Sequence, residues 1–166
     1  ESRIHPLRAV LNSYWLNIHV TMMLISYAAF AIAAFFAGLY LVKHFTGRES
    51  LLGGKPLMTM PQTEEFAYRL VQLGWPILTL GVALGAVWAD TAWGRFWGWD
   101  PKETWAFITW VGYTVYLHTR MVMGWRGKWS AAACLLGFVL VLITWIGVSY
   151  IPLFAGGLHS YASPTG

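Results

Sequence analysis

Long apolar stretches without charged side chains constrain this chain most. No Asp, Glu, Lys or Arg occurs from Ala9 to Val42, from Leu70 to Ala89, or from Ser130 to Ile151. Each stretch reaches the roughly 20 residues that a membrane-spanning helix needs. Charged residues make up 11% of the chain, against about 25% in soluble domains. Because backbone groups in lipid must be satisfied internally, helices are expected. The sequence therefore predicts an all-α integral membrane protein.

The chain is predicted to form a single membrane domain over residues 1–166, with about four transmembrane helices. Their apolar cores are expected at Leu16–Val42, Leu70–Ala89, Pro101 to about Thr119, and Ser130–Ile151. Because the chain begins at Glu1 without an initiator Met or a signal-peptide pattern, we expect it to be a piece of a longer polypeptide. The single cysteine excludes an internal disulfide and a Cys-x-x-Cys pair.

Local signals mark two helix starts and one kink. Asp100 is a predicted N-cap, followed by Pro at the first helical position and Glu103 at the third. Thr63 is predicted to cap a short amphipathic lead-in, Thr63–Arg69, before the second span. Pro76 is expected to kink that span.

A tryptophan-rich segment separates the second and third spans. Six of the eleven tryptophans lie between Trp88 and Trp110: Trp88, Trp93, Trp97, Trp99, Trp105 and Trp110. Tryptophans are common at membrane interfaces, so an aromatic belt is one reading. Their crowding beside Asp100 favours the other reading, an external loop with short helices that binds a large, flat, mostly apolar molecule.

Positive charge in the loops predicts the orientation. If the first span begins outside, the two cytoplasmic loops carry Lys43, Arg48, Lys55, Arg69, Arg120, Arg126 and Lys128, and the opposite side carries Arg3, Arg8, Arg95 and Lys102. The excess of Lys and Arg belongs inside. The net charge of +4 thus reports orientation and gives no reason to expect a nucleic-acid partner. The tryptophan loop, His19 and His159 are then expected on one side, outside the cytoplasm.

Two histidines on the same side as a tryptophan platform suggest a haem site. Neutral imidazoles are good axial ligands for haem iron, and indole faces support a porphyrin by stacking. Arg95 or Lys102 is a candidate partner for the propionates. His118 lies 17 residues after Pro101, about 25 Å deeper at 1.5 Å per residue, so it cannot share this haem. The alternative for each histidine is an ordinary interface residue.

The segment from Trp93 to Ala106, WGRFWGWDPKETWA, resembles the WWD motif of haem-handling proteins, most closely the CcsA/ResC family of System II cytochrome c biogenesis. Three further stretches are similar to that family's histidine segments: WLNIHV around His19, YLHTR around His118 and GLHSY around His159. The resemblance covers almost the whole chain. It implies an external WWD haem-binding segment at residues 88–105, contributed by a C-terminal portion of a CcsA-like protein.

The resemblance implies haem b as substrate or cofactor, held by His19, His159, Trp93, Trp97, Trp99, Asp100, Trp105 and His118. His19 and His159 would ligate iron at the external site, and His118 would ligate haem within the membrane. The implied activity is haem export and covalent attachment of haem to apocytochrome c through its Cys-x-x-Cys-His motif. It implies a haem lyase that works with a CcsB/ResB partner, without a nucleophile of its own, in the bacterial cytoplasmic or thylakoid membrane and in contact with its lipid.

Other functions fit the same residues. A haem-delivery module would present haem without ligating it. A bis-histidine electron-transfer subunit would bury its haem between spans, with paired histidines at matching depth. The position of His159 on a Gly-flanked tail argues against that arrangement. A transporter with only belt tryptophans would contain no haem.

Overall fold

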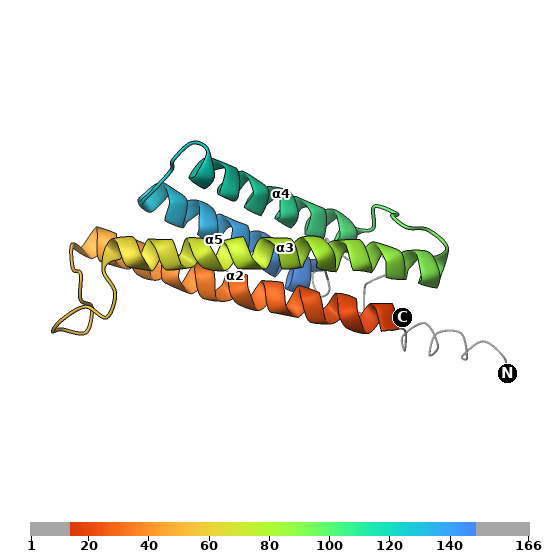
Figure 1. Cartoon of the computed structure of the whole chain (residues 1–166), viewed down its shortest axis with the longest axis horizontal. Coiled ribbons are helices and arrows are strands. Elements are labelled where there is room, and N and C mark those ends of the chain that lie inside the picture. Colours follow the sequence, from red (N-terminus) through yellow and green to blue (C-terminus); the bar gives the residue numbers. More distant parts are fainter. Residues whose placement is uncertain (1–13, 149–166) are drawn as a thin grey trace, which may run out of the picture.

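The computed structural model describes residues 14–148. Within this range the regular elements are α2 (Tyr14–Thr46), α3 (Met60–Trp93), α4 (Pro101–Met121), α5 (Lys128–Leu142) and a π-helical segment η1 (Ile143–Gly147), and none of these residues forms a β-strand. α2 and α3 lie side by side along their length, and α4 and α5 form an antiparallel hairpin beside them (Figure 1). α2, α3 and Lys128–Gly147 are long and apolar enough to cross a membrane. This confirms the predicted all-α integral membrane protein.

The predicted third span is a helix, but a more polar one. α4 has 21 residues and is not among the helices of residues 14–148 that are apolar enough to count as spans. It carries Lys102 and Glu103 at its start, and His118 and Arg120 in its last turn. Its polar side chains therefore need partners inside the bundle, and the contacts below supply several of them.

Aromatic rings and glycines interlock at the centre of the bundle. Phe30 of α2 is fully buried and stacks on Tyr113 of α4, with ring centroids 3.8 Å apart. A Cβ at Gly74 of α3 would lie 2.7 Å from the Phe30 ring, and one at Gly137 of α5 would lie 2.9 Å from the Tyr113 ring. Small residues allow membrane helices to approach closely. One layer of four residues thus joins all four helices.

Buried charges hold the bundle at the end formed by residues 47–59 and 122–127, here called the hairpin end. The Arg120 side chain is 1% exposed, and its guanidinium lies 3.3 Å from Glu64 and 3.1 Å from Glu65. It also donates to the carbonyl of Trp125, and Glu64 accepts from the backbone N–H of Gly127. These contacts fasten the start of α3 to the α4–α5 turn.

Several predicted boundaries need correction. Thr63 does not cap a separate lead-in, because α3 begins at Met60 and the Thr59 side chain accepts the capping bond from Gln62. Thr63 lies one turn inside, buried, and donates to the Thr59 carbonyl. α3 also continues through Pro76 and past Ala89 to Trp93, so the connecting loop starts only at Gly94. The predicted end of the fourth span lies outside the described residues.

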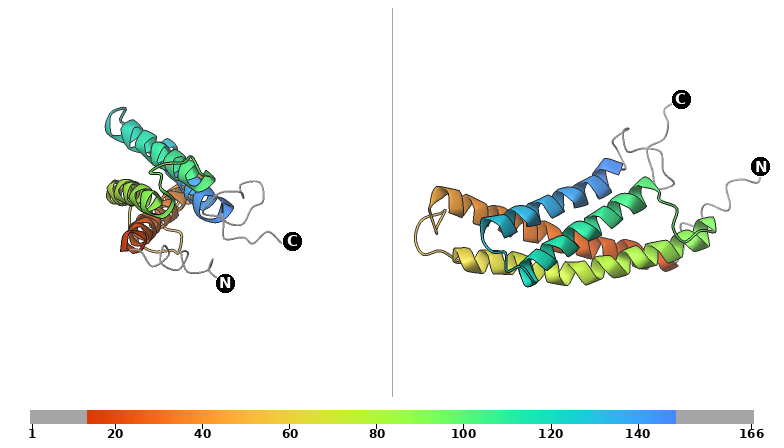
Figure 2. Two further views of the ribbon diagram at one scale, coloured as in Figure 1. Left: turned by 90° about the vertical axis from the view of Figure 1, so that its right-hand side faces the viewer. Right: turned by 90° about the horizontal axis from the view of Figure 1, so that it is seen from above.

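The opposite end of the bundle is formed by the start of α2, the end of α3, loop residues 94–100, the start of α4 and η1; we call it the tryptophan end. Figure 2 shows these segments meeting at one end from two further directions. The start of α2, which carries His19, thus lies at the same end as the tryptophan segment, and the membrane side to which this end belongs stays a prediction.

Candidate functional site

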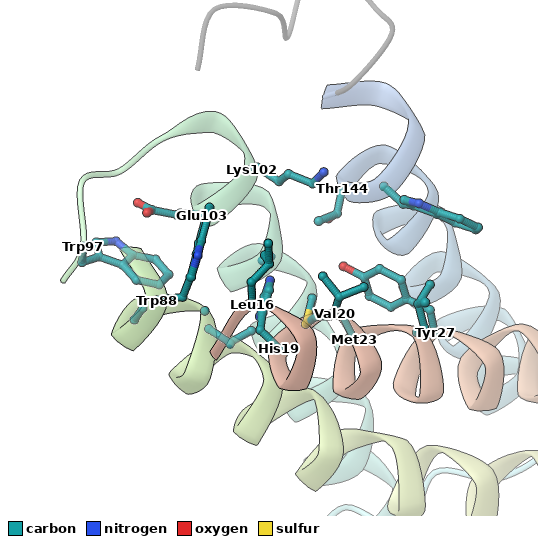
Figure 3. Close-up of a pocket in the computed structure, with 16 residues that line it drawn as sticks. Leu16, His19, Val20, Met23, Tyr27, Trp88, Trp97, Lys102, Glu103 and Thr144 are labelled. Carbon is teal, nitrogen blue, oxygen red and sulfur yellow. The ribbon is translucent and has the colours of Figure 1, made fainter. Parts of the chain in front are cut away.

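A cavity opens at the tryptophan end, between α2, α3, α4 and η1. Its enclosed volume is about 170 Å³, below the roughly 300–1,000 Å³ typical of small-molecule sites, so a larger ligand would extend beyond it into the open mouth. The wall is mainly apolar and includes Trp88, Trp97 and Trp145, with His19, Lys102, Glu103 and Thr144 as its polar members. Figure 3 shows His19, Trp88, Trp97, Lys102 and Thr144 around this space, each from a different part of the chain. Among residues 14–148, the cavity therefore combines indole surfaces with an imidazole, a cation and a carboxylate.

His19 enters this cavity from the second turn of α2. Its ring is half-buried, and its Nδ1 lies 2.7 Å from the carbonyl oxygen of Gly81 on α3. The ring packs against Gly85, where an added Cβ would lie 2.6 Å from Cε1 of His19. The position of this imidazole is thus set by α3, 62 residues away in the chain.

The Glu103 carboxylate organises the loop between α3 and α4. Its Oε2 accepts from the backbone N–H of Gly98 at 2.9 Å and of Asp100 at 3.2 Å, the two amides that flank Trp99. Trp99 has φ of 55°, a left-handed conformation that is rare for a bulky residue. Strained backbone of this kind concentrates at functional sites. Here the carboxylate holds the loop in that conformation.

A second hollow, an open apolar groove, lies between α3 and α4 beside the cavity. It is lined by Thr79, Val82, Ala83, Ala86, Phe96, Trp97, Trp99, Phe107 and Trp110. Trp97, Val82 and Ala86 line both hollows, so the two share a wall. Figure 3 shows Trp97 at the edge of the first cavity, beside Trp88.

A reciprocal cross-link closes the groove toward the middle of the bundle. Trp75 of α3 and Trp110 of α4 stack with ring centroids 5.7 Å apart. The Trp75 indole donates to Thr114, and the Trp110 indole donates to Thr79, both at 2.9 Å. Each threonine hydroxyl donates in turn to the carbonyl of the tryptophan four residues earlier on its own helix, Thr114 to Trp110 and Thr79 to Trp75. Both indoles are therefore satisfied inside the protein.

The predicted site residues divide into those that line the two hollows, those that lie elsewhere in the described structure, and His159. His19, Trp97 and Trp99 line the two hollows, whereas Trp93 and Trp105 line neither of them. Asp100 is buried and caps α4 by accepting from the N–H of Lys102, as predicted. His118 is exposed in the last turn of α4, at the hairpin end, so it cannot share a ligand with His19. His159 lies outside the described residues.

Arg95 and Lys102, the two predicted propionate partners, lie in different places. Lys102 lines the cavity, and Figure 3 shows its side chain extending toward Thr144. Arg95 is exposed and folds over the loop, where a Cβ at Gly98 would lie 2.5 Å from its Cζ. Of the two, only Lys102 is at the cavity.

Sequence reasoning missed several cavity residues. Thr144 and Trp145 belong to η1, and Met23 and Tyr27 follow His19 on one face of α2. The four-residue and eight-residue spacing of His19, Met23 and Tyr27 is a helical signal that could have identified the second pair. The π-helical segment had no such signal, although π segments recur at functional sites.

The chain is similar to known proteins along nearly its whole length. A family model described as cytochrome C assembly protein matches residues 1–155. The chain is 42% identical over 158 residues to the cytochrome c biogenesis protein CcsA of Chlamydomonas reinhardtii, covering 94% of this chain and 43% of that protein. It is 36% identical to CcsA of Mesostigma viride, covering 94% and 57%, and 37% identical to CcsA of Cyanophora paradoxa, covering 95% and 61%.

This chain spans about half the length of the curated relatives it matches. The WWD segment and the segments around His19 and His118 lie within the matched residues 1–155, whereas the segment around His159 lies just beyond them. The chain therefore belongs to the cytochrome c assembly protein family, as a member of its CcsA group.

Proposed function

We propose that the tryptophan end binds haem and presents it for covalent attachment to an apocytochrome c. The observation that carries this proposal is the cavity, which brings His19 of α2 together with Trp88 and Trp97 of the WWD segment and with Lys102 of α4. These residues supply an iron ligand, flat stacking surfaces and a cation, the three features a haem with its propionates requires.

Each group then has a role. His19 would be one ligand of the haem iron, and His159, whose surroundings resemble the family's second external histidine segment, would be another. Trp97 lines both hollows, which supports its role in contacting the porphyrin at the boundary between them. Lys102 pairs with a propionate, a role that its place in the cavity wall supports and that Arg95 does not share.

The covalent step needs no nucleophile from this chain. Each cysteine thiol of the Cys-x-x-Cys-His motif adds across a haem vinyl group: its sulfur bonds to one vinyl carbon, its proton goes to the other, and the carbon–carbon double bond becomes single. This addition balances without an oxidant or reductant. The chain contributes by holding the haem while the thiols approach, so its catalysis is by proximity and orientation.

His118 is proposed to ligate haem on its way through the membrane. It is exposed on α4 at the hairpin end, so its partner ligand would come from a CcsB/ResB-like protein packed against that helix. The positive residues Lys43, Arg69, Arg126 and Lys128 also lie toward the hairpin end, which supports a cytoplasmic hairpin end and an extracytoplasmic tryptophan end.

The test is the visible absorption spectrum of the full-length protein, purified in detergent with its partner. His19→Gly and His159→Gly are each expected to weaken the low-spin haem bands, and added imidazole is expected to restore them. His118→Gly is expected to leave the external site's bands in place. Spectra unchanged by both His19→Gly and His159→Gly would remove these ligands from the mechanism. Haem attachment to a co-expressed apocytochrome c separates ligation from mere delivery.

A further inference from the structure

His19 is seated on α3 by two glycines one turn apart, Gly81 and Gly85. Nδ1 of His19 lies 2.7 Å from the Gly81 carbonyl oxygen. A Cβ built at Gly85 would lie 2.6 Å from Cε1 and 2.7 Å from Nδ1 of the same ring, closer than real Cβ contacts come. The imidazole therefore occupies the space that any side chain at position 85 would need.

The hydrogen bond to Gly81 defines the tautomer of His19. A carbonyl oxygen can only accept, so Nδ1 must carry the hydrogen and donate it. In the neutral ring the lone pair is then on Nε2. Metal-ligating histidines commonly donate their second ring N–H to a backbone carbonyl, which fixes the ring and raises its basicity.

We infer that Gly81 and Gly85 form a positioning seat that presents His19 to haem iron through Nε2. This inference rests on the proposed function, because it assigns residues that act through the proposed ligand. Gly81 acts with its carbonyl, and Gly85 acts by lacking a side chain. Neither glycine touches the iron, so both are positioning residues.

The alternative is that these glycines only let α2 and α3 pack closely. A Gly-x-x-x-Gly spacing is a common packing device in membrane helices. The same interface supplies a matched control, because a Cβ at Gly74 would lie 2.7 Å from the ring of Phe30. Gly74→Ala and Gly85→Ala each add one methyl group against an aromatic ring of α2. Only Gly85→Ala displaces the imidazole.

The experiment compares Gly85→Ala, Gly74→Ala and His19→Gly in the full-length protein with its partner, using haem titration followed by absorption. Gly85→Ala is expected to weaken haem binding about 10- to 100-fold, the range for lost orientation of a metal ligand, with recovery on adding imidazole. Gly74→Ala is expected to bind haem like the wild type. In the His19→Gly background, Gly85→Ala is expected to add no further loss.

Two results would overturn the inference separately from the function. If His19→Gly weakens binding but Gly85→Ala behaves like Gly74→Ala, the seat is wrong while the haem site stands. If His19→Gly has no effect, the proposed ligand fails and the seat with it. A readout without haem is the nitrogen NMR spectrum of the ¹⁵N-histidine-labelled apoprotein, assigned with His19→Gly. The Nδ1–H form of His19 is expected; the Nε2–H form would refute the seat even if Gly85→Ala failed to fold.

Discussion

Replacing Glu103 with Gln should loosen loop residues 94–100 of the WWD segment, because Gln has nearly the size of Glu but lacks its charge. The carboxylate accepts two backbone N–H bonds, from Gly98 and Asp100, on either side of the left-handed Trp99. Bonds to a charged acceptor contribute about 1.5–3 kcal/mol each, against about 0.5–1.5 kcal/mol for neutral ones. The backbone strain at Trp99 opposes them by about 1–3 kcal/mol.

The magnitude follows from that balance. Two bonds weakened by about 1 kcal/mol each would shift the equilibrium between the closed and open loop by ~2 kcal/mol if both were fully buried. Glu103 is only half-buried, so a shift of about 1–2 kcal/mol is expected, which opens the loop about 5- to 30-fold more often. Amide hydrogen exchange over residues 97–103, measured by mass spectrometry, should accelerate by that factor, and haem affinity should fall with it.

Thr104→Ala provides the matched control for this loop. The Thr104 hydroxyl donates to the Trp99 carbonyl at 3.3 Å from an exposed position, so its loss should change exchange less than about threefold. The reasoning about the carboxylate is refuted if Glu103→Gln and Thr104→Ala give the same exchange rates over this segment.

Three further changes test the bundle that carries the site, each by thermal unfolding in detergent. Arg120→Ala should destabilise the protein by about 3–5 kcal/mol, because it leaves the buried Glu64 carboxylate without its cation. Arg126→Ala removes only an exposed ion pair, 3.5 Å from Glu65, and should cost about 1 kcal/mol or less. Equal losses would contradict this. Thr109→Val should cost only about 1 kcal/mol. The Thr144 hydroxyl, whose oxygen lies 2.9 Å from that of Thr109, can donate to the Leu140 carbonyl instead. A loss above about 3 kcal/mol would mean that this carbonyl does not satisfy the hydroxyl. Trp75→Phe replaces the indole with a smaller ring and removes its N–H bond to Thr114, so a loss of at least about 0.5–1.5 kcal/mol is expected. No loss would show that neither the bond nor the indole packing contributes.

Local chemistry made one part of the site predictable. The start of α4 was read correctly from Asp100, Pro101 and Glu103, because a capping box satisfies the first amides of a helix with side chains only a few residues away. The second role of Glu103, at Gly98, was not predicted. It depends on a loop conformation with φ of 55° at Trp99, which residue type argues against.

Long-range packing made the rest unpredictable. Orientation rules placed His19 at the tryptophan end, but the contact with Gly81 spans 62 residues and leaves no periodic trace. The cap lies at Thr59 instead of the predicted Thr63, because Thr59 offers the same side chain four residues earlier and the first helical turn tolerates Pro61. The α3 helix continues past Ala89 to Trp93, and Trp88 and Trp93 pack edge to face in its last turns, with ring centroids 4.8 Å apart.

The two ends of the bundle divide stability and binding between them. At the hairpin end, Arg120 and Glu64 tie three helices through buried charge, and at mid-bundle the pair Trp75 and Trp110 ties α3 to α4. Between that pair and the tryptophan end, α3 and α4 both line the two hollows. The contacts that join the helices lie elsewhere, so the hollows cost the bundle little stability. A bulky ligand bound at the tryptophan end would then contact and order loop residues 94–100 rather than separate the helices. Ligand binding should therefore slow amide exchange in this loop while leaving the α4–α5 turn at residues 122–127 unchanged, and protection of both would show that the bundle moves as a whole.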